Sequence, residues 1–296
     1  MRILIAGASG FLGSHLVQRF RTDGHDVTRL VRRTASGSDE SAWDPYAGEL
    51  DQDAVEAADV VVNLAGTPTA GNPHSQRWAR ELEESRVTTT RVLAGAIARA
   101  EGKPAFLAGN GISFYGDHGA DQVTEESDSR GDALLTRVTQ VWQAAAEPAA
   151  ESGARVCVLR TAPVMDRRSP PLKQMRVAFS LGLGTRLGDG RQYFPMISLR
   201  DWVGAVAFLA GNDSVSGPFN LCCPEPPTNG EFTETLASAL GRKAFLSVPK
   251  VALKVGAGQM SPELLGSVRA RPAALEKAGY EFLDPDVRAV VAAALA

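Results

Sequence analysis

One glycine motif near the N-terminus constrains the fold more than any other feature of the chain. The run Gly7-Ala8-Ser9-Gly10-Phe11-Leu12-Gly13 places glycine at every third position. It follows the apolar stretch Ile3-Leu4-Ile5-Ala6, typical of a buried strand, and it opens an amphipathic stretch from Phe11 to about Thr22. In this context the first glycine allows a tight turn, the second lets backbone amides approach a pyrophosphate, and the third permits close helix–strand packing. The motif therefore predicts a dinucleotide-binding strand–turn–helix unit.

The rest of the first half alternates apolar strands with helices. This order implies right-handed crossovers and a parallel, doubly wound sheet. The strands are almost continuously hydrophobic, as expected for a sheet covered on both faces. Strands are predicted at residues 27–31, 58–65, 105–108 and 155–160, and helices at 11–22, 76–99 and 133–152.

The second half is less regular. Prolines and a glycine-rich segment at 182–190 interrupt the alternation, and further helical patterns occur at 229–240 and 250–256. The fold class predicted is therefore α/β, a Rossmann-type doubly wound parallel sheet with a smaller C-terminal α/β lobe. We expect residues 1–165 to form the nucleotide-binding domain and residues 166–296 the smaller lobe. The helix near 201–210 fits either unit.

The residues at the end of the second predicted strand distinguish an NAD site from an NADP site. An NAD site usually has an acidic residue there, which binds the ribose 2′-hydroxyl. This chain has Arg32 and Arg33 instead. Guanidinium groups suit a 2′-phosphate, so the sequence favours NADP as the cofactor, although two solvated arginines at a strand end would look the same.

A second small-residue turn follows the third predicted strand. Asn63-Leu64-Ala65-Gly66 would let the backbone pass near the adenine ribose and the pyrophosphate. A purely structural turn between strand and helix would have a similar sequence. By contrast, no histidine or cysteine spacing resembles a metal site, so no metal is predicted.

Composition excludes several classes of function. The net charge is −3, and no basic block is longer than a pair, so no nucleic-acid or membrane partner is expected. The apolar run Val290 to Ala296 is far too short to span a bilayer. We expect a cytoplasmic protein, a monomer or homodimer, whose partner is a small-molecule substrate.

Further motifs along the chain resemble one family. These motifs, together with the glycine motif and Asn63-Leu64-Ala65-Gly66, make the chain similar to an extended or atypical short-chain dehydrogenase/reductase. It resembles the nucleotide-sugar-epimerase-like family, described as NAD(P)-dependent epimerase/dehydratase-like, whose members carry a short C-terminal domain of unknown function. The additional motifs are Trp43-Asp44-Pro45, Ser85-Arg86-Val87, Phe114-Tyr115-Gly116, Leu181-Gly182-Leu183-Gly184, Gly190-Arg191-Gln192, Thr228-Asn229 with Glu231-Phe232, and Val268-Arg269-Ala270-Arg271-Pro272.

The resemblance implies a set of cofactor contacts. Asp44 stands where extended members place an acidic residue near the adenine, and Arg86 is a further candidate on the helix after the third strand. The other implied contacts are Gly7, Ser9, Gly10, Phe11, Leu12, Arg32, Leu64, Ala65 and Gly66.

The usual catalytic pair of such reductases is absent. Their mechanism uses a tyrosine as proton donor, with a lysine four residues later that lowers the tyrosine pKa. None of the four tyrosines has a lysine at that spacing, and no lysine lies between Lys103 and Lys173. Leu134-Leu135 and Val138-Thr139 align with the missing pair. The polar candidates left near a nicotinamide ring are Tyr115, Ser113 and Asn110, each of which suits a packing or turn role equally well.

Two functions of different class follow. The first is an NADP-dependent oxidoreductase or epimerase that exchanges hydride with a small polar substrate, the proton coming from Tyr115 or water. The second is a catalytically degenerate NADP-binding sensor or scaffold. Hydride transfer depends on positioning more than on a protein acid, which favours the enzyme.

Overall fold

A computed structural model describes residues 1–69 and 71–296. Its centre is an eight-stranded sheet in the order β12-β8-β6-β5-β1-β2-β3-β4. All neighbouring strands are parallel except β3 and β4, which form an antiparallel edge. The strands are β1 Arg2–Ala6, β2 Asp26–Val31, β3 Glu40–Asp44, β4 Glu49–Leu50, β5 Val60–Asn63, β6 Ala105–Gly111, β8 Val156–Thr161 and β12 Gly217–Leu221.

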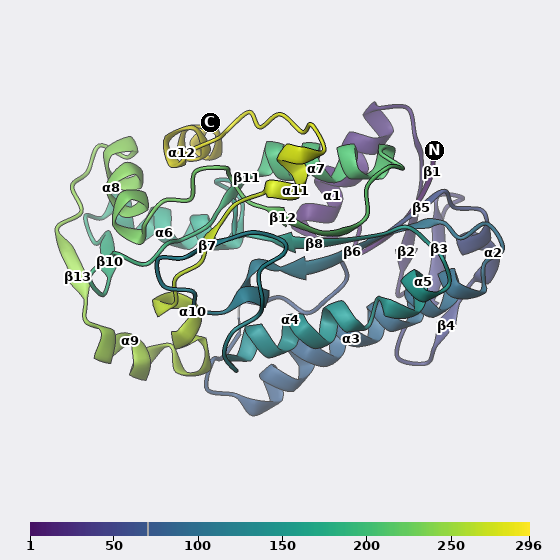
Figure 1. Ribbon diagram of the computed structural model, residues 1–296, viewed down its shortest axis with the longest axis horizontal. Helices are drawn as coiled ribbons and strands as arrows, with labels where there is room; N and C mark the ends of the chain where they lie inside the picture. The colour runs from purple at the N-terminus through teal and green to yellow at the C-terminus, as the bar shows by residue number, and fades with distance from the viewer. Residues whose placement is uncertain (70) are drawn as a thin grey trace.

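Helices cover both faces of this sheet (Figure 1). α1 packs beside α7 on one face, and α3 contacts α4 and α5 on the other. These helices are α1 Phe11–Thr22, α2 Gln52–Glu56, α3 Gln76–Arg99, α4 Leu134–Ala144, α5 Glu147–Glu151 and α7 Leu199–Gly211. Among the described residues, no helix combines the length and apolar character needed to cross a membrane.

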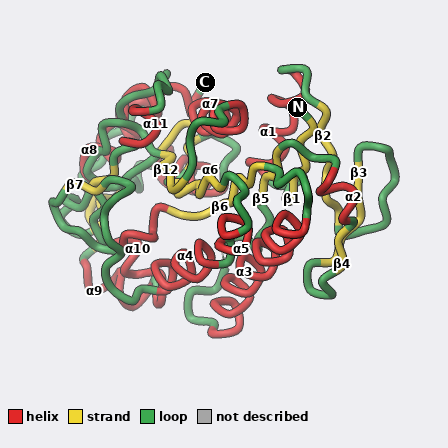
Figure 2. Tube along the Cα trace, turned by 45° about the vertical axis from the view of Figure 1, so that its right-hand side comes forward, coloured by secondary structure: helices red, strands yellow, loops and turns green. Residues whose placement is uncertain are grey.

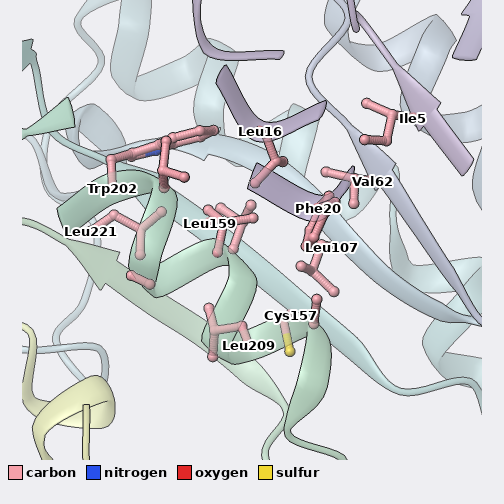
Figure 3. Packing of buried hydrophobic residues seen from close by; sticks show 14 of the residues in the cluster. Ile5, Leu16, Phe20, Val62, Leu107, Cys157, Leu159, Trp202, Leu209 and Leu221 are labelled. Carbon is pink, nitrogen blue, oxygen red and sulfur yellow. The ribbon is translucent and has the colours of Figure 1, made fainter. Parts of the chain in front are cut away.

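The main core lies between the sheet and the α1–α7 layer. Leu16 and Phe20 of α1 and Trp202 of α7 are fully buried there, against strand residues such as Ile5 and Leu159 (Figure 3). A second cluster fills the opposite face, under α3. Both faces of the strands are thus buried, which is why their sequences are continuously apolar rather than alternating.

The remaining elements gather at the end of the sheet away from β3 and β4 (Figures 1 and 2). A separate apolar cluster, which includes Phe179, Phe232 and Val290, packs α6, α8 and α12 together. They are β7 Gln122–Val123, β9 Val164–Met165, α6 Pro170–Ser180, β10 Thr185–Leu187, β11 Ile197–Ser198, α8 Asn229–Ala239, β13 Leu246–Val248, α9 Lys250–Gly256, α10 Ser261–Leu265, β14 Arg269–Ala270, α11 Ala273–Lys277 and α12 Val287–Leu295, with short 3₁₀ turns at η1 Ile112–Tyr115 and η2 Gly258–Met260.

Three details differ from the sequence expectation. The helix expected over 133–152 is two helices, α4 and α5, because Pro148 in the first turn of α5 cannot continue a helix from upstream. The polar segment after β2 contains β3 and β4. The main sheet also gains β12, whose sequence Gly-Pro-Phe-Asn-Leu is a weak strand signal.

The division at residue 165 stays a prediction. α7, the helix near 201–210, packs on α1 and shares the main core, and β12 completes the sheet beside β8. Both elements come from the chain beyond residue 165 and lie with the first strands.

Candidate functional site

The turn between β1 and α1 needs glycine at two of its three motif positions. Gly7 has φ +80°, and a Cβ there would lie 2.6 Å from the backbone of Leu64. A Cβ on Gly13 would lie 2.2 Å from the carbonyl oxygen of Gly7. Gly10 differs, because its φ is −71° and a Cβ would meet only the Gly7 oxygen, at 3.3 Å. Gly7 and Gly13 therefore serve the fold, whereas a Cβ at Gly10 would require only a small shift of the Gly7 oxygen.

The N-terminus of α1 is open to an anion. Gly10 is the N-cap and supplies no side-chain acceptor, and the first turn contains no acidic residue. The Ser14 amide donates the first intrahelical hydrogen bond, to the Gly10 carbonyl. The amides between Gly10 and Ser14 therefore have no intrahelical acceptor. Ser9 and Gly10 are exposed, and Phe11 and Leu12 are half-buried against the core. Free amides and the helix dipole fit a pyrophosphate at this point.

The turn after β5 lies against the glycine motif. Asn63 is fully buried, donates to Thr90 at 2.9 Å, and accepts a hydrogen bond from the Ala65 amide at 3.0 Å. The Leu64 amide donates to Ala6 of β1. These bonds hold Leu64 and Ala65 half-buried next to Gly7, and Gly66 exposed. The predicted contacts of both turns are thus brought together at one edge of the sheet.

Arg86 of α3 lies directly beneath Gly66. A Cβ on Gly66 would lie 3.3 Å from the Arg86 side chain. The guanidinium donates only to backbone carbonyls, those of Thr67 and Leu82, and it lies 5.2 Å from the ring centroid of Trp142. Burial lowers the pKa of Arg86 to about 10, and no carboxylate of the described residues pairs with it. A buried cation without a counter-ion, beside a nucleotide turn, fits an anionic ligand.

The two arginines after β2 have different surroundings. Arg33 donates to Glu40 of β3 through both terminal nitrogens, at 2.6 and 2.8 Å, and this pairing lowers the pKa of Glu40 to about 2. Arg32 is exposed and makes no side-chain hydrogen bond within the described residues. Arg33 is therefore engaged by the protein, whereas the guanidinium of Arg32 can meet an incoming phosphate.

Asp44 ends β3 and organises a turn. Its carboxylate accepts hydrogen bonds from the amides of Tyr46 and Ala47, at 2.9 and 3.3 Å. The side chain is exposed at the edge of the sheet. Its predicted contact with the adenine stays a prediction.

Tyr115 has no solvent-accessible surface. Its hydroxyl donates to Asn220 and accepts from Arg160, both at 2.7 Å, and burial raises its pKa to about 12. Arg160 also stacks on Phe114, with 3.6 Å between the guanidinium carbon and the ring centroid. The hydroxyl is saturated inside this network, so Tyr115 has no accessible oxygen through which to act on a substrate in this conformation.

Asn110 is also used by the fold. Its side chain donates to the Thr139 carbonyl at 3.0 Å and accepts from the Gly111 amide at 2.7 Å. Thr139 itself bonds back to Leu135 and Thr136 within α4. The positions that align with the missing tyrosine and lysine therefore lie in α4 and take part in the packing of that helix.

Ser113 is the candidate that points elsewhere. It is half-buried in η1, directly after β6, and its hydroxyl donates to Glu263 of α10 at 2.8 Å. The structure thus separates the three catalytic candidates, since Tyr115, Asn110 and Ser113 have no hydrogen bond in common.

Sequence reasoning missed Glu263. It lies 150 residues from Ser113 in the chain, and its local sequence Ser-Pro-Glu-Leu-Leu gives no sign of a site. Only the folding of the C-terminal segment onto η1 brings the two together. In the described part of the chain, histidine, cysteine, aspartate and glutamate form no group suited to a metal ion.

Sequence comparison places the chain among known proteins. Residues 3–222 match the NAD dependent epimerase/dehydratase family, and residues 248–294 match a domain of unknown function, DUF1731. The chain is 41% identical over 281 residues to the epimerase family protein ML0860 of Mycobacterium leprae, covering 95% of this chain and 91% of that one. It is 32% identical over 297 residues to the human epimerase family protein SDR39U1, covering 98% of each.

Solved structures agree. The crystal structure of human SDR39U1 with NADPH is similar, with a TM-score of 0.86, 30% identity and 98% of each chain covered. A nucleoside-diphosphate sugar epimerase from Corynebacterium glutamicum has a TM-score of 0.82 and 30% identity, over the whole of this chain and 58% of that one. The fold is therefore of the Rossmann type, with a mostly parallel sheet. The chain belongs to the NAD dependent epimerase/dehydratase family and carries a DUF1731 segment at its C-terminal end.

Proposed function

We propose that this protein binds NADP(H) at the β1–α1 turn and exchanges hydride with a small polar substrate, as an oxidoreductase or epimerase. The observation that carries the proposal is the uncapped N-terminus of α1, with exposed Gly10 at its start. The human relative, whose crystal structure is described with NADPH, supports the choice of cofactor.

The pyrophosphate would be held by the first-turn amides of α1, with Arg86 adding positive charge from below Gly66. Arg32 would bind the 2′-phosphate, because Arg33 is already paired with Glu40. The bound nicotinamide supplies hydride chemistry that no side chain of the protein can provide. The protein supplies position, since an oriented reactant in a dry site needs little further help from a protein acid.

The strand order of the sheet supports a position for each half of the proposed ligand. The strand order reverses between β1 and β5, and dinucleotides bind across the crevice at such a point, outside the carboxyl ends of the strands. The adenosine half then belongs over β1 and β2, near Arg32. The nicotinamide half belongs over β5 and β6, on the side of Ser113 and the C-terminal segment.

A binding protein without turnover is the second candidate. The buried Tyr115 and the absence of a tyrosine–lysine pair favour it. Retention of the complete nucleotide turn is compatible with both.

Incubation of the purified protein with NADPH and a panel of aldehydes, ketones and quinones separates the two. Turnover that is lost in Gly10→Asp supports the enzyme. Tight NADPH binding without turnover of any compound supports the binding protein. Wild-type NADPH affinity in Gly10→Asp would contradict both, because a carboxylate at that position clashes with and repels a pyrophosphate.

A further inference from the structure

The C-terminal segment crosses the carboxyl edge of the sheet at β5 and β6. At one end, the Gln259 amide donates to the Pro73 carbonyl in the loop after β5, and His74 contacts Gly256. Met260 of the same segment packs against a buried cluster that includes Trp78 and Leu134. Figures 1 and 2 both show α10 next to the end of α4.

The chain after α10 is anchored firmly. The Ser267 amide donates to Asp117 at 3.1 Å, and the Ser267 hydroxyl bonds to Gly119 and accepts from the Tyr193 amide. β14 then pairs with β7. Held on both sides, Glu263 has a defined position over η1.

Only one of the two carboxyl oxygens of Glu263 has a hydrogen-bond partner within the described residues. One carboxyl oxygen accepts the hydrogen bond from Ser113, whereas the other is buried and has no hydrogen-bond partner within the described residues. Burial raises the pKa of Glu263, against the hydrogen bond from Ser113 and the nearby Leu135 amide, which lower it. An unpartnered carboxyl oxygen is costly when ionised and less so when it carries a proton.

The surrounding titratable groups are engaged elsewhere. His74 of the loop before α3 bonds to Gly256, Asp117 after η1 accepts from Ser267, and Arg137 of α4 donates to Asp132. No charged side chain contributes to the pKa of Glu263. Its proton is therefore controlled by burial, by Ser113 and by the Leu135 amide.

We propose that Ser113 and Glu263 form the proton-transfer pair of this site, in place of the missing tyrosine and lysine, with Ser113 contacting the substrate oxygen and Glu263 positioned behind it. The inference rests on the proposed function. In reduction of a carbonyl, hydride from reduced cofactor reaches the carbon, Ser113 gives its proton to the oxygen, and Glu263 gives its proton to Ser113. Water then reprotonates Glu263. Oxidation of an alcohol reverses each transfer.

The protonation state of Glu263 decides which direction the pair serves. An ionised carboxylate only accepts hydrogen bonds, so it holds the single proton of Ser113 and leaves the Ser113 oxygen to accept from an alcohol. A neutral carboxyl donates to Ser113 and releases the hydroxyl proton toward a carbonyl oxygen. The same two residues thus suit both half-reactions.

The test needs no known substrate. The affinities of NADP⁺ and NADPH are measured by calorimetry across a pH series for the wild type, Glu263→Gln and a control, Glu281→Gln, whose side chain is exposed. An ionised Glu263 near the positive nicotinamide ring should raise the NADP⁺-to-NADPH affinity ratio with pH, by roughly fivefold or more. Glu263→Gln should abolish that rise, and Glu281→Gln should keep it.

Several outcomes would overturn the pair. If the NADP⁺-to-NADPH affinity ratio of the wild type did not depend on pH, or if its rise with pH persisted in Glu263→Gln, Glu263 would serve only to hold the C-terminal segment in place. Binding of neither redox form by the wild type would refute the proposed function together with the pair.

Thermal unfolding near pH 5 checks that Glu263→Gln is folded. With any carbonyl compound that is turned over, Ser113→Ala and Glu263→Gln should each lower kcat about a hundredfold, and Glu263→Gln should remove the pH dependence.

Discussion

Arg33 and Glu40 form a bidentate ion pair between the end of β2 and the start of β3, with nitrogen–oxygen distances of 2.6 and 2.8 Å. The pair fixes which of two adjacent arginines is available to a ligand. Arg32, one residue earlier, has no such partner in the described part of the protein.

Arg32→Ala should weaken NADPH binding roughly ten- to a hundredfold, because hydrogen bonds to charged groups contribute about 1.5 to 3 kcal/mol. Binding of NADH should hardly change, since NADH lacks the 2′-phosphate. Calorimetric titration of both cofactors measures the difference. Arg33→Ala is the matched control, with a smaller loss expected. Equal losses for NADPH and NADH in Arg32→Ala would show that Arg32 does not bind the phosphate.

Substitution of the motif glycines should affect either the stability of the fold or the affinity for NADPH, depending on the position. Gly13→Ala forces a Cβ to within 2.2 Å of the Gly7 oxygen, so it should destabilise the fold by about 1 to 3 kcal/mol or more. Gly10→Ala meets nothing closer than 3.3 Å and needs no unusual φ, so its Tm should stay near that of the wild type while NADPH affinity falls. Thermal unfolding and calorimetry on both variants test this. A large loss of Tm in Gly10→Ala would contradict the assignment of that space to the cofactor.

Tyr115→Phe should lower stability and leave catalysis intact. The change leaves the side-chain oxygen of Asn220 without its hydrogen-bond donor and removes one acceptor from Arg160, which keeps Gln143 and the Glu125 carbonyl, at a cost of about 1 to 3 kcal/mol. Chemical denaturation gives the free energy of unfolding, and NADPH affinity provides a parallel readout that should not move. If turnover were lost at unchanged stability, Tyr115 would have to be reconsidered as the proton donor.

Much of this fold follows from local sequence. The glycine motif, the apolar strands and α3 appear where their patterns predict them, because a sheet buried on both faces requires continuous apolar strands. β12 escaped prediction because a five-residue strand that begins Gly-Pro depends on its neighbour β8 for stability. The turns after β1 and β5 were predictable because the residues of each are close in sequence. The Ser113–Glu263 contact was not, since it joins residues 150 positions apart and leaves no periodic signal.

Glu263→Gln should change stability in a pH-dependent way. The folded-state pKa of Glu263 is raised by burial, so the stability that its neutral form contributes is present at low pH and lost as the pH rises through that pKa. Glutamine resembles the neutral form and does not ionise. The variant should therefore match the wild type below the ordinary carboxyl pKa of about 4.3 and gain in Tm relative to it as the pH rises above that value. A relative loss of Tm on raising the pH would show that the folded state stabilises the carboxylate instead.

Calorimetric titration of the unmodified protein with NADPH and with NADH tests the central claim most directly. The open α1 N-terminus and Arg32, which has no side-chain partner among residues 1–69 and 71–296, predict one NADPH per chain, bound at least about tenfold more tightly than NADH. Binding of neither cofactor, or equal affinity for both, would contradict the account.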